Sequence, residues 1–311
     1  MRIKKMMKKV IIALMAILAS NGVKAQQIDV YCNDNPKPEV SFLNTETKKY
    51  KVVFREEKGT YNGHKYVEIG GLKWATMNIG ATTVAESMET AIGDYYAWGE
   101  LDTYYSKRTG IRFEWDKTSE LTHIKGKKTG YDGKNYFDEP VYKVEWSSVP
   151  YDKNYRIKPE YDVAKATWGG KWRMPTREDI NMLLEACGCK CGDPVKNATT
   201  TITEGGVYIV KSGLTVDGEQ YKVAGALFVS SGDPTQRMFL PSAGSIQDNT
   251  VYGATGIFSA DIWLGEVIDP AEDGGYSFPM SGYDFGISNK VIYSPMAAYR
   301  EWGFQIRPVA N

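Results

Sequence analysis

The residues best suited to chemistry in this 311-residue sequence are its four cysteines, three of which occupy five consecutive positions. The crowded set reads CGCKC and comprises Cys187, Cys189 and Cys191, whereas Cys32 stands alone far upstream. Four cysteines allow three disulfide pairings, and a bridge between cysteines two residues apart closes a strained ring. Cys187–Cys191 together with Cys32–Cys189 is therefore the least strained arrangement.

Other uses of these thiols stay open. An exposed, strained disulfide would allow redox exchange. A metal ion would need the three clustered thiols and a distant imidazole from His64 or His123, the only histidines. Cys187 alone can be a buried thiol on a helix face. An oxidising compartment favours disulfides, so we expect structural bridges, no metal and no cofactor.

Aromatic rings are the second chemical resource, since they make up 13% of the residues and include 21 tyrosines and 8 tryptophans. A ring offers a flat apolar face on which a sugar or a peptide can stack. Residues 101–160 and 242–294 mix such rings with glycine and polar residues, as binding loops do. The candidate ligand contacts in these stretches are Tyr104, Tyr105, Trp115, Tyr252 and Trp263. The alternative is that each ring packs beneath its own loop.

Catalytic constellations do not stand out. Two histidines and no nucleophile elbow argue against a Ser-His-Asp hydrolase. Neighbouring acids such as Glu56-Glu57 or Asp138-Glu139 are typical of solvated loops rather than of a glycosidase pair. We therefore expect a protein that is not an enzyme.

The stretch GGKWRMPTREDINMLLEACGC, at 169–189, predicts a strand, a sharp turn and a helix. Apolar residues fall on one helical face at Ile180, Leu183, Leu184 and Cys187. Thr176 can cap the first turn with Asp179 in a capping box, and Gly188 can end the helix in a left-handed conformation.

Two further stretches predict strands. Trp168, Trp172 and Met174 alternate around a Gly-Gly pair, which places Arg173 on the opposite face, where it can anchor a loop through a charge-assisted hydrogen bond. The terminal GFQIRPV predicts a closing strand near the N-terminal one. Its inward residues would be Phe304, Ile306 and Pro308, and its outward residues Gln305 and Arg307.

The first 25 residues predict a secretory signal peptide. The basic MRIKKMMKK precedes a short apolar run at 10–19, and the sequence Val-Lys-Ala then ends at Ala25. Cleavage there leaves Gln26 at the mature N-terminus. Residues 26–63 form an N-terminal extension and residues 64–311 one domain of many short strands and few helices, so the predicted class is α+β. The protein is expected in the periplasm, at the cell surface or outside the cell.

Charge excludes two classes of partner. Lysine and arginine together number 38, as do aspartate and glutamate, so the formal net charge is zero. A chain without net charge has no long-range field for nucleic acid or for an anionic membrane surface. No apolar segment after the leader is long enough to predict a membrane span.

Five motifs carry a family resemblance. GLKWATMNIGA, GDYYAWGE, YDVAKATWGGKWRMPT, FLPSAG and GFQIRPV occur in this order between Tyr66 and Val309. Together they resemble the Fibrobacter succinogenes major paralogous domain, which is distantly similar to the formylglycine-generating enzyme superfamily. The resemblance implies a C-type-lectin-like core of twisted antiparallel strands, two helices and long loops.

The resemblance also suggests which functions to compare. Formylglycine-generating enzymes use a reactive cysteine pair late in the domain, and this chain has no cysteine after Cys191. An oxidase of that type is therefore the least favoured hypothesis. The favoured one is a secreted or surface-associated, non-enzymatic binding module whose ligand is a glycan or a protein surface. The alternative is a structural subunit of a surface assembly.

Export gives the first testable expectation. Protein isolated from the envelope of its native cell should begin at Gln26, because signal peptidase needs small residues at the positions that Val23 and Ala25 occupy. Intact-mass analysis measures this directly. A chain that retains Met1 contradicts the assignment of a cleaved leader.

Overall fold

The computed structural model describes residues 27–32, 40–43, 49–54, 59–101, 103, 128–134, 140–144, 150–247, 250–252, 258–269, 281–300 and 302–311. The predicted leader, with Ala25 and Gln26, lies outside these residues. The chain divides into two compact units, Met1–Gly63 and His64–Asn311. No described helix is long and apolar enough to cross a membrane.

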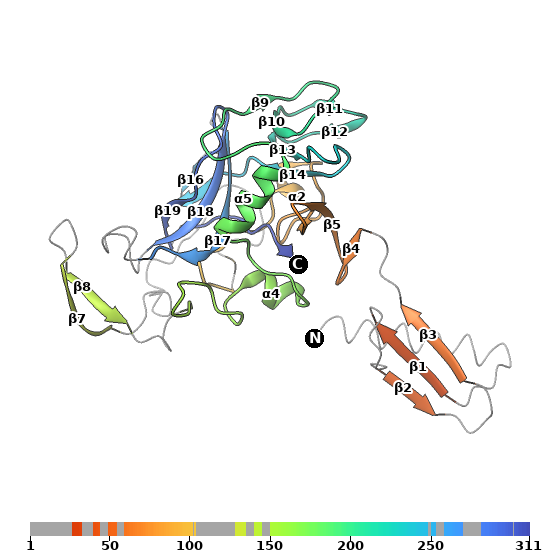
Figure 1. The fold of residues 1–311 in the computed structure, drawn as a ribbon, viewed down its shortest axis with the longest axis horizontal. Coiled ribbons are helices and arrows are strands. Elements are labelled where there is room, and N and C mark those ends of the chain that lie inside the picture. The colour runs from red at the N-terminus through yellow and green to blue at the C-terminus, as the bar shows by residue number, and fades with distance from the viewer. Residues whose placement is uncertain are drawn as a thin grey trace. The chain divides into compact units, whose positions relative to one another are not determined.

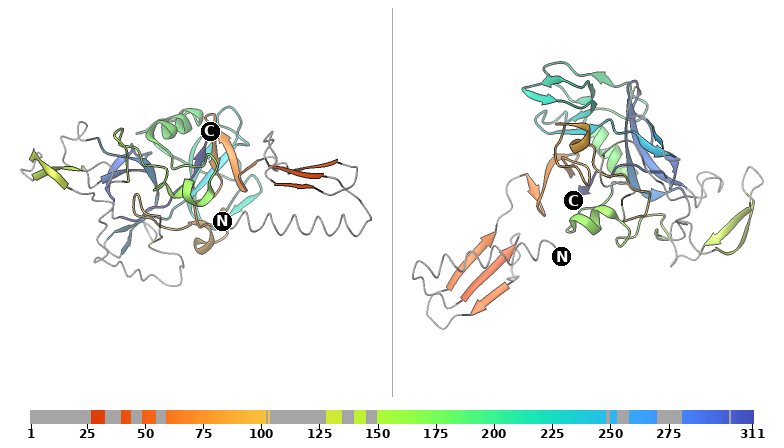
Figure 2. Two further views of the ribbon diagram at one scale, coloured as in Figure 1. Left: turned by 90° about the horizontal axis from the view of Figure 1, so that it is seen from below. Right: turned by 180° about the vertical axis from the view of Figure 1, so that it is seen from behind.

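The first unit contains a small sheet. Its strands are β1 (Gln27–Cys32), β2 (Val40–Leu43) and β3 (Lys49–Phe54), in the order β2-β1-β3 (Figure 2). β1 runs antiparallel to β2 and parallel to β3. A two-residue strand, β4 (Thr60–Tyr61), follows.

The second unit consists mainly of strands, which confirms the α+β class (Figure 1). Its described helices are α2 (Met88–Ala91), α4 (Val163–Trp168) and α5 (Arg177–Ala186). Two helices were expected, and the described part of the unit has three, because a serine or aspartate N-cap begins each of the two short ones.

In the described part of this unit, the strands form three sheets and three hairpins. One sheet has the order β14-β13-β10-β9, formed by β9 (Lys196–Asn197), β10 (Gly206–Val210), β13 (Gly225–Val229) and β14 (Arg237–Pro241). The second has the order β17-β18-β19, formed by β17 (Ser259–Val267), β18 (Ser281–Ser288) and β19 (Met296–Tyr299). In the third, β6 (Leu72–Ala75) pairs with both β5 (His64–Ile69) and β20 (Val309–Ala310). The hairpins are β7 (Lys128–Lys134) with β8 (Pro140–Val144), β11 (Leu214–Val216) with β12 (Glu219–Tyr221), and β15 (Ser245–Gln247) with β16 (Thr250–Tyr252).

Strand β10 lies between two apolar clusters. Val207 and Ile209 face the cluster beneath α5, whereas Tyr208 and Val210 face a second cluster with Tyr221. Because side chains alternate between the faces of a strand, a strand buried on both sides shows an unbroken apolar run such as GVYIV.

Helix α5 begins and packs as its sequence predicts. The Thr176 side chain accepts from the backbone N–H of Asp179, and the Asp179 carboxylate accepts from that of Thr176, which completes the capping box. Gly188 has φ of 72°, the left-handed conformation expected at the end of the helix. The predicted apolar face is buried in the main core, at Ile180, Leu183, Leu184 and Cys187. In Figure 1 the helix lies beside the strands of that core.

The predicted strand before α5 is wrong. Trp168 ends helix α4 instead, because Asp162 caps a run of helix-forming residues and its Oδ1 accepts from the Lys165 backbone N–H at 3.1 Å. Gly169 and Gly170 then turn the chain with φ of 67° and 56°. Only one antiparallel bridge follows, between Arg173 and Val309.

The outward orientation predicted for Gln305 and Arg307 is also wrong, since both are almost fully buried. Arg307 donates to Asn78 Oδ1 and to the carbonyl oxygens of Ala75 and Phe239, each at 2.8 Å. The terminal segment therefore passes through the interior, where these acceptors compensate for the desolvation of the guanidinium. The pairing of β20 with β6 confirms that the chain closes near the first strands of this unit.

Packing of α5 yields a graded stability test. Leu183→Ala should lower the free energy of unfolding by about 2–5 kcal/mol through the cavity it leaves. Thr176→Ala should cost about 1 kcal/mol through loss of the cap. Asn181→Ala, at an exposed position of the same helix, is the control and should change little. Urea unfolding measures all three, and equal small effects would show that α5 is not docked as described.

Candidate functional site

A half-open groove of about 560 Å³ lies between α4, the start of α5 and the segment that joins them. The residues that line it come from α4, α5, β6, β17 and the connecting loops. They are Leu72, Arg156, Ile157, Pro159, Asp162, Lys165, Lys171, Trp172, Arg173, Met174, Thr176, Glu178, Asp179, Met182, Gly265 and Asn311. Its volume falls within the range typical of small-molecule sites.

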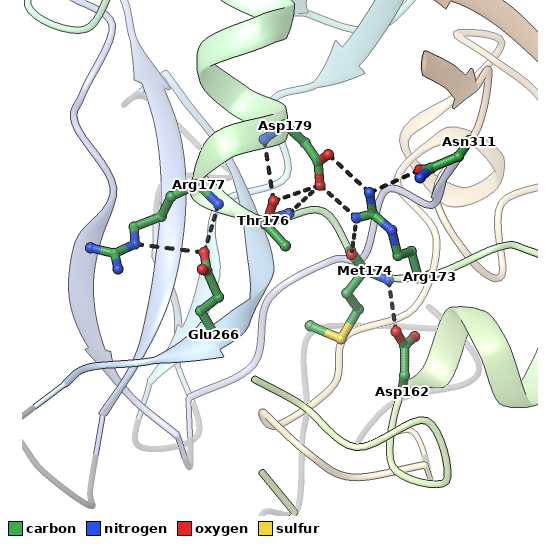
Figure 3. Close-up of polar contacts among 8 residues, drawn as sticks. All are labelled: Asp162, Arg173, Met174, Thr176, Arg177, Asp179, Glu266 and Asn311. Atoms are coloured by element: carbon green, nitrogen blue, oxygen red, sulfur yellow. Dashed lines mark hydrogen bonds and ion pairs between the residues drawn. The ribbon is translucent and has the colours of Figure 1, made fainter. Parts of the chain in front are cut away.

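Asp162 ties one wall of the groove together. Its Oδ1 caps α4, while its Oδ2 accepts from the backbone N–H of Met174 at 2.9 Å (Figure 3). Burial raises the pKa of this carboxyl group, and the hydrogen bonds from Met174 and Lys165 oppose that rise. The carboxylate therefore joins α4 to the segment before α5.

Arg173 and Asp179 form a bidentate pair among the residues that line the groove. Arg173 Nη1 and Nη2 donate to the two Asp179 oxygens at 2.5 and 2.9 Å, and the same guanidinium donates to Met174 O and Asn311 Oδ1, each at 3.1 Å (Figure 3). Although burial acts in the other direction, the hydrogen bonds from Arg173 and Thr176 lower the pKa of Asp179. The predicted role of Arg173 as an anchor through a charge-assisted bond is thus confirmed.

The start of α5 is also held from its other side. Glu266 on β17 accepts from the Arg177 backbone N–H at 2.7 Å and lies 3.6 Å from its Nε (Figure 3). The Arg177 guanidinium stands 4.2 Å from the centre of the Tyr283 ring, within cation–π range. An acid near the first turn suits the helix dipole, so α5 is fixed on both sides where it borders the groove.

The rim of the groove carries a different charge from its walls. The buried acids Asp162 and Asp179 are both engaged in hydrogen bonds. Exposed charges of the lining are three cations and one acid: Arg156, Lys165, Lys171 and Glu178. The exposed part of the lining therefore carries a net positive charge.

An aromatic stack lies next to α4. The His64 and Trp168 rings are parallel with centroids 3.7 Å apart, and Trp172 meets Trp168 edge-on at 5.3 Å. Burial lowers the pKa of His64, which favours its neutral, stacking form. Trp168 is half-buried, so the stack forms a rigid surface one helical turn from Lys165.

A second polar feature is a pair of acids on the β17–β18 ribbon. Burial raises the pKa of Asp261 to about 6, against a hydrogen bond from Ser259. Burial and the charge of Asp261 raise the pKa of Asp284 to about 8. Gly286 makes room for this arrangement, because a Cβ there would stand 2.2 Å from Asp261 Oδ1. The pair can hold a proton near neutral pH.

One of the predicted aromatic contacts is wrong. Trp263 has no exposed surface, and its indole N–H donates to Tyr96 O at 2.7 Å. The Phe304 ring meets it at 4.5 Å, so Trp263 packs in the core as the alternative held.

The remaining candidate rings are not tested. Tyr104, Tyr105 and Trp115 lie outside the described residues. Tyr252 ends β16 opposite Ser245. These four stay predictions.

The clustered cysteines are free in the structure. Cys187, the C-cap residue of α5, is buried, and burial raises the pKa of its thiol to about 12. Burial also raises the pKa values of Cys189 and Cys191. Cys32 ends β1 opposite Phe54. A thiol with a raised pKa is a weak nucleophile, and the disulfide pairing stays a prediction.

Sequence patterns alone missed most of the groove. Asp162 had a recognisable signal, since an aspartate before VAKA is a helix N-cap pattern. Lys165 and Lys171 had none, because their meeting at one groove depends on the Gly169-Gly170 turn. Among the described residues, no group of three or more histidine, cysteine, aspartate or glutamate side chains could hold a metal ion.

Comparisons with known proteins leave the family open. No family model, curated protein or solved structure matches the chain.

The buried acids predict how stability depends on pH. The folded Asp284 titrates near 8 and the unfolded side chain near 3.8, so the folded state holds an extra proton between these values. The contribution of this proton to folding stability is fully present below pH 3.8 and is lost as the pH rises through about 8. The unfolding free energy of the wild type should fall as the pH rises from 5 to 9. In the Asp284→Asn variant this fall should be smaller by at least about 1 kcal/mol.

Urea unfolding at the two pH values measures this difference. Glu160→Gln, which neutralises an exposed carboxylate, is the control and should follow the wild type. Parallel pH profiles for the Asp284→Asn variant and the wild type would show that Asp284 is ionised in the folded protein.

Proposed function

We propose that this protein is an exported, non-enzymatic binding module and that the groove between α4 and α5 receives its ligand, a glycan or a protein surface. The observation that carries the proposal is the construction of the groove. Its walls are fixed by hydrogen bonds, whereas its open surface combines apolar side chains with exposed cations. A preformed concave surface of this kind binds a ligand with little cost of reordering.

The two buried acids of the groove, Asp162 and Asp179, are already engaged in hydrogen bonds, which favours binding over acid–base catalysis. Asp179 accepts from Arg173 and from Thr176, and Asp162 accepts from Met174 and Lys165. A general base must be able to reach a substrate proton, and these carboxylates would first have to leave their partners.

The fold proposal rests on the family resemblance. We infer a C-type-lectin-like core of the Fibrobacter succinogenes major paralogous type for the second unit. Support comes from the five ordered motifs and from the antiparallel strands β6, β14 and β20, which include parts of three of them. Two motif arginines, Arg173 and Arg307, make multiple hydrogen bonds, which accounts for arginine at both positions.

A groove-filling variant tests the proposed function. Ligands retained by the mature protein are first identified with a glycan array and a pull-down from cell extract. Met182→Trp places a large ring in the groove and should weaken that binding about tenfold or more. Met88→Trp is the matched control, because both methionines are 37% exposed on helices and Met88 does not line the groove.

The outcomes separate the hypotheses. Equal binding by the two variants would place the ligand site elsewhere on the molecule. If neither method retains a ligand and cross-linking in intact cells joins the protein to its own assembly, the structural-subunit alternative replaces the binding module.

A further inference from the structure

The excess of cations at the groove indicates the class of ligand that suits it. Arg156, Lys165 and Lys171 are exposed at the lining, and Glu178 is the exposed acid among the same residues. Arg173 offsets the charge of Asp179, and the three exposed cations still outnumber the two remaining acids of the lining, Asp162 and Glu178. Complementarity therefore calls for a ligand that brings negative charge.

The three cations come from separate parts of the chain. Arg156 precedes α4, Lys165 lies within α4, and Lys171 follows the Gly169-Gly170 turn. Lys165 Nζ donates to Gly170 O, a contact that keeps its ammonium next to the turn that carries Lys171. Cations from three elements at one groove suit a ligand whose charges repeat along its length.

An aromatic stack adjoins the groove through Trp172, which contacts Trp168 and also lines the groove. Trp168 follows Lys165 by three residues, which places the two side chains on one face of α4. The stacked His64 ring and the edge of Trp172 hold the Trp168 ring in place. A stiff aromatic ring beside an ammonium fits a ring that has both an apolar C–H face and a carboxylate.

We propose that the groove binds an acidic polysaccharide whose sugar rings carry carboxylates. Lys165, Lys171 and Arg156 pair with the carboxylates of successive sugars, and the apolar residues of the lining, which include Trp172, contact the ring faces. This rests on the proposed function, since it names the ligand class of the same groove. An acidic peptide would offer similar charges on flexible side chains rather than on rings, so it is treated as an outcome of the test.

Calorimetry with matched oligosaccharides tests the inference. The mature protein is titrated with oligomers of galacturonate, mannuronate and glucuronate, and with the same oligomers after reduction of their carboxyl groups. At least one acidic oligomer should bind about tenfold or more tightly than its reduced partner, and added salt should weaken that binding. Poly-glutamate of similar length is the peptide arm and should bind more weakly.

Paired charge reversals identify the surface that is responsible. The double variant Lys165→Glu/Lys171→Glu should bind the acidic oligomer about tenfold or more weakly. Lys190→Glu/Lys211→Glu makes the same charge change at exposed positions outside the groove and should bind as the wild type does. Urea unfolding of both variants checks that they fold. If the first variant is unfolded, Arg156→Glu replaces it.

Failure of this inference differs from failure of the proposed function. If acidic and reduced oligomers bind alike and Met182→Trp blocks both, the groove is a binding site but the acidic ligand class is overturned. If poly-glutamate binds as tightly as the best oligomer, the saccharide class is overturned. If no oligomer binds better in its acidic form, the inference fails regardless of what the array retains.

Discussion

The paired hydrogen bonds between Arg173 and Asp179 are the contact on which the groove of the second unit depends. Asp179 completes the capping box of α5, and the backbone of Arg173 bridges to Val309 in the closing strand β20. One ion pair thus joins the start of the helix, the last strand and the wall of the groove. Its position in a half-buried setting makes the two-pronged geometry worth more than an exposed pair would be.

Other buried polar side chains hold the terminal segment and the two helices α4 and α5 in place. Arg307 donates to three acceptors in the interior. Asp162 joins α4 to Met174, and Glu266 holds the start of α5. Buried groups with this many partners fix geometry because any displacement would leave a charge unsatisfied. Lys165 and Lys171, by contrast, are exposed at the groove.

Local sequence signals predicted local structure well. Thr176, Asp179 and Gly188 bound α5 as expected, because capping and helix-ending residues act within one turn of the chain. The sequence patterns gave wrong predictions where contacts between distant residues determine whether a side chain is buried. Alternation around Arg307 suggested a solvent-facing side chain, yet its partners come from residues more than sixty positions away.

The site was harder to predict for the same reason. Tryptophan is a residue type that often stacks on ligands, but the indole N–H of Trp263 donates to Tyr96 O. The two residues are 167 positions apart in the sequence, so no local pattern predicts this contact. Lys165 and Lys171 meet at one groove only because α4 ends in a glycine turn. The central claim is that Arg173 and Asp179 act as one unit, and a double-mutant cycle of unfolding free energies with Arg173→Met and Asp179→Asn tests it most directly. We expect a coupling energy of about 1–3 kcal/mol, whereas additive effects of the two substitutions would contradict the account.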